Sequence, residues 1–132
     1  MNLSPRPTQQ ARSAKTQQKL IDAAIETLVE VGIANLTTTE VCRRAGTSQG
    51  ALFKHFPSKS ALICSAMESL YASLVEDYRL AVQVMPEGID RVEFCVDSLW
   101  ALFQTPKLLA VYDLHIAART DPMLRDVVAP ME

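Results

Sequence analysis

The chain has 132 residues, of which 48% are hydrophobic, a composition that excludes wholesale disorder and fits one ordinary domain, or a small domain with part of another. Charges interrupt every apolar stretch before the roughly 18 residues that a membrane span needs, and no apolar run follows the basic first residues, so we expect a cytoplasmic protein without a membrane segment. The net charge of -2 combines +4 over residues 1–60 with -6 over residues 61–132, which indicates either that the amino-terminal part meets a polyanion or that basic side chains cluster there by chance.

The amino-terminal residues are predicted to form a flexible arm followed by a long helix. Residues 1–12 are polar and include Pro5 and Pro7, so they have no core to join. From Thr16 the pattern becomes helical, and Gly32 is expected to end the helix because glycine adopts the left-handed conformation at little cost. The apolar stripe of this helix comprises Leu20, Ile21, Ala24, Ile25, Leu28 and Val29.

Two short capped helices are predicted next. Thr37 and Glu40 form a T-x-x-E capping box, in which the hydroxyl accepts from a free backbone N–H and the carboxylate reaches back to another. This helix is expected to end at Ala45-Gly46, and Ser48 to cap a third helix over residues 49–56. Two short helices joined by a tight turn form a helix-turn-helix, whose second helix presents its first side chains to a DNA major groove.

The remaining chain is predicted to be helical as well. Pro57-Ser58 starts a long fourth helix, which residues 85–88 end. A fifth helix is expected over residues 89–104 and a sixth over residues 106–120, and Asp121-Pro122 begins a seventh. The inward residues of the fourth helix are expected to be Ile63, Met67, Leu70, Leu74 and Tyr78. Those of the fifth are expected to be Val92, Val96, Leu99, Trp100 and Phe103.

Nothing in the sequence predicts an enzyme or a metal centre. Cys42, Cys64 and Cys95 are too few and too scattered for a disulfide framework, so we expect them to be reduced and to act as small hydrophobic residues. Because only His55 and His115 could join them as ligands, we expect no metal and no other cofactor. The sequence contains no motif with a nucleophile beside a base and no glycine-rich phosphate loop, so we predict no catalytic residue.

A spaced pattern around the segment TTTEVCRRAGTSQGALFKHF identifies a family. Its members are Gly32, Thr37, Glu40, Val41, Ala45, Gly46, Ser48, Gly50, Leu52, Phe53, His55, Phe56, Ser58, Lys59 and Leu62. Through them residues 16–63 resemble the DNA-binding domain of the TetR family of bacterial repressors, and residues 88–126 resemble, more loosely, the inducer-binding domains of one branch of that family. The resemblance implies an all-α fold, with a three-helix helix-turn-helix domain at residues 13–60 and an incomplete helical-bundle effector domain at residues 61–132.

Three residues of the second short helix are candidates to read DNA bases. Gln49 can bond adenine N6 and N7 as a bidentate pair, Ala51 can meet a thymine methyl group, and Lys54 can meet a guanine or a phosphate. The alternative for Gln49 and Lys54 is an exposed side chain on a solvated helix face, and Ala51 could merely be small.

Hydroxyl groups and cations near the helix starts are candidates for phosphate contacts, because free backbone amides and the helix dipole favour anions there. They are Thr37, Thr39, Ser48, His55 and Lys59. Thr37 and Ser48 would be expected as caps even without DNA. The resemblance implies a phosphate contact for His55, whose alternative is an imidazole packed beneath the fourth helix, while Lys59 opposes the dipole of that helix and so favours a phosphate partner.

The second half of the chain offers candidates for a ligand pocket between helices. Aromatic side chains would supply contact area and a few polar groups would orient the ligand. The candidates are Trp100, Phe103, Tyr112, His115 and Arg119. The alternative is ordinary core packing, since aromatic residues at helical spacing are common in cores.

From the helix-turn-helix and the resemblance we expect a sequence-specific transcriptional repressor that binds double-stranded operator DNA and is released by a small-molecule inducer. The alternative is a truncated sensor or interaction module that no longer binds DNA strongly. The resemblance implies a homodimer for a full-length family member. Because the last two helices of the family, which normally form the dimer interface, are missing here, dimerisation of the 132-residue chain is in doubt.

Overall fold

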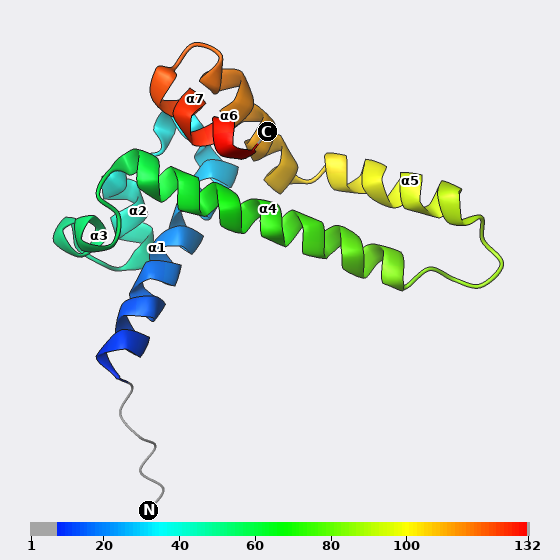
Figure 1. Ribbon diagram of the computed structural model, residues 1–132, viewed down its shortest axis with the longest axis horizontal. Coiled ribbons are helices and arrows are strands. Elements are labelled where there is room, and N and C mark those ends of the chain that lie inside the picture. The colour runs from blue at the N-terminus through cyan, green and yellow to red at the C-terminus, as the bar shows by residue number, and fades with distance from the viewer. Residues whose placement is uncertain (1–7, 132) are drawn as a thin grey trace, which may run out of the picture.

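A computed structural model describes residues 8–131, and within that range the chain is helical without a strand (Figure 1). The elements are α1 (Gln9–Val31), η1 (Ile33–Asn35), α2 (Thr38–Ala45), α3 (Gln49–His55), α4 (Lys59–Gln83), α5 (Arg91–Phe103), α6 (Pro106–Ala118), α7 (Pro122–Val128) and η2 (Ala129–Met131). The η elements are short 3-10 turns. The predicted all-α class is confirmed.

The predicted caps and turns are present in the helix-turn-helix. The Thr37 hydroxyl accepts from the Glu40 backbone N–H, and the Ser48 hydroxyl accepts from the Ala51 N–H, at 3.1 Å each. Gly46 ends α2 with φ 63°, a left-handed conformation that a residue with a Cβ rarely adopts. These local signals fix where α2 stops and where α3 starts.

The first helix begins earlier than the sequence pattern predicted. α1 starts at Gln9, where the Thr8 hydroxyl caps it by accepting from the Ala11 N–H at 3.2 Å. The expected flexible arm over residues 1–12 is therefore wrong for its last part, and residues 1–7 lie outside the described residues. The first turns of α1 are polar and exposed, so the apolar period that marks the buried part of the helix gives no sign of them.

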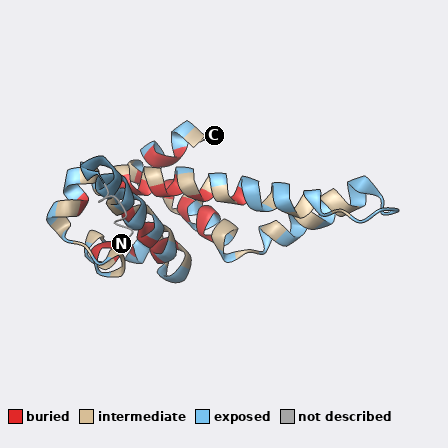
Figure 2. Cartoon of the chain, turned by 90° about the horizontal axis from the view of Figure 1, so that it is seen from below, coloured by how far each residue is buried: buried red, intermediate tan, exposed pale blue. Residues whose placement is uncertain are grey.

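One hydrophobic core joins the helix-turn-helix to the helices that follow it. α1 packs against α2 and α4, α6 contacts α1 and η1, and α7 packs on α4 and α6. Figure 2 shows the buried residues gathered where these helices meet and along the first part of α4. The fully buried side chains include Leu20, Leu28, Leu36, Val41, Leu52, Leu62, Ile63, Met67, Leu70 and Leu114. The predicted boundary between residues 60 and 61 thus runs through a continuous core.

The last part of α4 and all of α5 project from this body as a hairpin (Figure 1). The prediction that five residues of α5 point inward is wrong. Val92, Val96, Leu99, Trp100 and Phe103 are exposed by 72, 58, 41, 67 and 42%, and α5 has no buried residue. The helix packs on α4 and α6 through another side, which includes Phe94, Cys95 and Leu102, so its most apolar stripe faces solvent.

Within residues 8–131, no helix combines the length and the apolar character needed to cross a lipid bilayer.

Candidate nucleic-acid interface

One side of α3, the rear side, is packed into the core, and the opposite side, the front, is open to solvent. On the rear side Leu52 is fully buried and Phe56 is 3% exposed, and both belong to the same core as Val41 of α2. On the front side Lys54 is exposed, and Phe53 is 49% exposed. A short helix anchored in this way can enter a DNA major groove without loss of its position.

A network of ion pairs ties α2 to α1. Arg44 lies 2.6 Å from carboxylate oxygens of both Glu40 and Glu30, and Arg43 holds Glu40 in a bidentate pair at 2.7 and 2.8 Å. Hydrogen bonds from Arg43, and then from Arg44, lower the pKa of Glu40 from 4.5 to about 2. The Glu40 carboxylate therefore binds two guanidinium groups instead of the Thr37 backbone that the capping box predicts, because charge-assisted bonds are the stronger ones.

This network decides which cations remain available to DNA. Arg43 and Arg44 already neutralise acidic neighbours. Among the described residues, Lys54 forms no ion pair and stands on the open face of α3. The net positive charge that faces outward from the recognition helix thus comes from Lys54.

Gln49, the first candidate for base reading, folds back on α2. Its Nε2 donates to the Thr39 hydroxyl oxygen at 3.0 Å, and its Oε1 is buried without a donor. Bidentate recognition of adenine needs both amide atoms, so Gln49 has to leave Thr39 before it can read a base. Ala51, the second candidate, is half-buried on α3.

The phosphate candidates lie in different surroundings. Thr37 and Ser48 are exposed, and each hydroxyl accepts a cap bond but keeps its own proton free to donate. Thr39 accepts from Gln49, and His55 is half-buried at the end of α3. Lys59 lies apart from these groups, since it lines a hollow of about 320 Å³ together with residues of η1, α6 and α7.

The contact between Thr39 and Gln49 brings the start of α2 beside the start of α3, so the candidates at these two helix starts share one surface. Residues 20–66, which include this surface, match the model of bacterial regulatory proteins of the tetR family. The chain carries a tetR-family domain. Its match extends from α1 across the whole helix-turn-helix into α4.

Curated relatives extend the similarity to most of the chain. HTH-type transcriptional regulator CymR of Pseudomonas putida is 35% identical over 125 residues, which cover 94% of this chain and 62% of CymR. An uncharacterized HTH-type transcriptional regulator of Mycobacterium bovis is 29% identical over 121 residues, covering 92% of this chain and 62% of that protein. The chain therefore spans about three fifths of the length of these curated relatives.

Solved structures share the fold of this chain. The multidrug binding protein EbrR, crystallised with imidazole, superposes with a TM-score of 0.71 at 24% identity, covering 97% of this chain and 70% of EbrR. A transcriptional regulator from Rhodococcus sp. Rha1 gives a TM-score of 0.66 at 20% identity, covering 86% of this chain and 62% of that one. The helical fold described above is thus shared with these solved structures.

The five predicted ligand residues separate into two groups. Trp100, Phe103 and Tyr112 lie on an open apolar surface, where the Phe103 and Tyr112 rings are 6.1 Å apart. His115 and Arg119 instead line a pocket of about 290 Å³ between α6 and α7. The structure does not bring the five together around one cavity.

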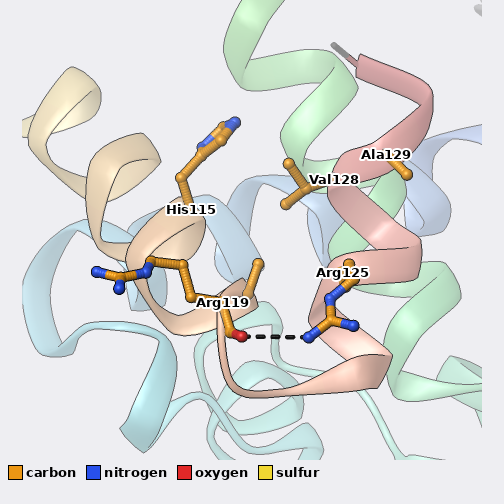
Figure 3. Close-up of a pocket in the computed structure, with 6 residues that line it drawn as sticks. His115, Arg119, Arg125, Val128 and Ala129 are labelled. Atoms are coloured by element: carbon orange, nitrogen blue, oxygen red, sulfur yellow. Dashed lines mark hydrogen bonds between the residues drawn. The ribbon is translucent and has the colours of Figure 1, made fainter.

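The pocket between α6 and α7 contains one cation that sequence analysis missed. Arg125 lines it and donates from Nη2 to the Arg119 carbonyl oxygen at 3.1 Å, whereas the Arg119 side chain extends away from Arg125 (Figure 3). The His115 ring bonds the Val111 carbonyl at 2.8 Å and lies 3.4 Å from the Tyr71 hydroxyl. No motif marks Arg125 in the sequence, because its role depends on how α7 folds back on α6.

Proposed function

We propose that this chain is a sequence-specific DNA-binding transcriptional repressor that a small-molecule effector releases from its operator. The observation that carries the proposal is the geometry of α3, which has a buried rear edge at Leu52 and an exposed front edge at Lys54. The tetR-family match over residues 20–66 supports the same function.

Binding is expected to begin with charge and hydroxyl groups at the open surface. Lys54 attracts the phosphate backbone, and the hydroxyls of Thr37 and Ser48 donate to phosphate oxygens at the starts of α2 and α3. Gln49 and Ala51 then supply sequence preference through adenine and thymine contacts.

The helices that follow provide a route from an effector to the DNA surface. The pocket of His115 and Arg125 lies on α6 and α7, and α6 contacts both α1 and η1. A ligand that binds better to one arrangement of α6 against α1 lowers DNA affinity by that difference, and such coupling is typically about 1–3 kcal/mol.

Fluorescence anisotropy with duplexes selected from a random pool tests DNA binding. Sequence-specific affinity should fall steeply as salt rises, and Lys54→Ala should weaken binding to all duplexes and reduce the salt slope by about 1. Lys107→Ala is the matched control, since Lys107 lies on α6 and pairs with Asp77 at 2.9 Å. Selection that yields no preferred sequence would contradict the proposed function.

A second function, an interaction module without strong DNA binding, is favoured by one observation. The α5 stripe leaves large apolar side chains in solvent, with Trp100 exposed by 67%. A chain that binds a protein partner but gives no salt-dependent signal on selected DNA would support this alternative.

A further inference from the structure

The first turns of α1 form a polar helix that the core of the protein does not cover. No residue from Gln9 to Lys19 is buried, and the core begins at Leu20, which is fully buried. These turns extend past the body at the end of the molecule that carries α2 and α3, opposite the hairpin (Figure 1). Because packing of an apolar face does not stabilise them, their side chains are available to a partner.

Basic side chains lie along one side of these turns. Arg12, Lys15 and Lys19 follow one another at intervals of three and four residues, which places them on the same side of a helix. All three are exposed, and residues 8–21 contain no acidic side chain. We call these three residues the α1 stripe. In the part of the chain that the structure describes, none of them forms an ion pair.

The α1 stripe is unfavourable for the isolated chain. Like charges three and four residues apart on a helix repel, and cations near a helix start oppose its dipole. The first turn of α1 has no acidic residue to offset this. Asp22, the first acidic residue of α1, accepts from Gln18 at 2.9 Å and does not pair with Lys19. An anionic partner along this side would relieve both costs.

We propose that the α1 stripe binds the phosphate backbone of DNA beside the bases that α3 reads. This inference rests on the proposed function, which makes DNA the partner of α3. α1 packs against α2 and also contacts α3, so the stripe and the recognition helix belong to one packed unit. From Arg12 to Lys19 the stripe spans about 10 Å of helix, over which a DNA strand offers up to about three phosphates. Such contacts add affinity and fix orientation without reading sequence.

Anisotropy titrations of the 132-residue chain at several salt concentrations test the stripe, on a selected duplex and on a scrambled one. A variant with Arg12→Gln, Lys15→Gln and Lys19→Gln removes the charges and keeps residues that favour a helix. It should bind both duplexes at least about tenfold more weakly near 0.1 M salt, with a salt slope smaller by about 2–3. The ratio of the two affinities should stay the same, because the stripe reads no base.

Two control variants separate charge at this place from charge in general. A variant that exchanges lysine and arginine within the stripe keeps the charges and should bind as the wild type does. Arg79→Gln, Arg91→Gln and Lys107→Gln together remove the same charge from α4, α5 and α6, and should leave the salt slope unchanged. Each single replacement in the stripe should lower the slope by about 1, which tests the inference without the triple variant.

A stripe variant with unchanged helical content by circular dichroism and the wild-type salt slope would overturn the inference. An equal loss of slope in the control on α4, α5 and α6 would overturn it as well. Neither result would contradict the proposed function, which fails instead when selection yields no preferred sequence. The scrambled duplex needs no sequence preference, so it reports on the stripe in that case too.

Discussion

The hydrogen bond between Gln49 and Thr39 allows a quantitative test of how the recognition helix reads DNA. Thr39→Val keeps the shape of the side chain and removes the hydroxyl that accepts from Gln49 Nε2 at 3.0 Å. A neutral hydrogen bond contributes about 1 kcal/mol net, which corresponds to roughly a fivefold change in Kd. Because Gln49 must break this bond to read adenine, the variant should bind its preferred duplex about fivefold more tightly.

A double-mutant cycle isolates this effect. Anisotropy titrations would compare the wild-type chain with Thr39→Val, Gln49→Ala and the double variant on one duplex, and on the same duplex with each adenine replaced in turn. The gain from Thr39→Val should vanish in the Gln49→Ala background, which gives a coupling energy of about 1 kcal/mol.

The alternative role of Thr39 gives the opposite result. If the Thr39 hydroxyl donates to a phosphate, Thr39→Val weakens binding equally in both backgrounds and on every duplex. That outcome would refute the reasoning that the hydrogen bond to Thr39 restrains Gln49 and must break before Gln49 contacts a base. Unchanged sequence preference in Gln49→Ala would remove Gln49 from the set of base-reading residues.

Three further substitutions test the scaffold by denaturation. Ser48→Ala removes the cap of α3 and should lower the free energy of unfolding by about 1 kcal/mol in a urea titration. Leu52→Ala leaves a cavity beneath α3 and should lower the free energy of unfolding by about 2–5 kcal/mol. The same variant should also lose DNA binding. The lowered pKa of Glu40 stabilises the fold above its ordinary value of 4.5, and this contribution is lost as the pH falls toward about 2. Glu40→Gln should therefore flatten the stability profile over that window, and an unaltered profile would show that the two arginines do not act through Glu40.

Local chemistry made the helix-turn-helix predictable. The caps at Thr37 and Ser48 and the turn at Gly46 depend on groups within four residues along the chain, and the structure places all three as expected. Leu52 and Phe56 form the buried side of α3, whereas Phe53 between them is 49% exposed. Such caps and turns can be predicted because all the groups that form them lie within a short stretch of sequence.

Longer-range arrangements were not predictable in the same way. The period of α5 identifies an apolar stripe correctly, but a stripe does not say whether its cover lies in the same molecule, and the inward placement of Trp100 failed for that reason. The pairing of Gln49 with Thr39 depends on the angle between α2 and α3. The separation of His115 from Phe103 depends on how α6 leaves α5, which no local pattern encodes.

The continuous core has a practical consequence for engineered regulators. Leu62, Ile63 and Met67 of α4 lie in the same buried cluster as Leu20 and Leu52, so the core beneath the helix-turn-helix includes side chains from the next helix. A chimera that grafts residues 1–60 onto a foreign sensor would lack these buried side chains of α4. A transplant that keeps α4 through Leu74 carries all the buried residues of that helix with it.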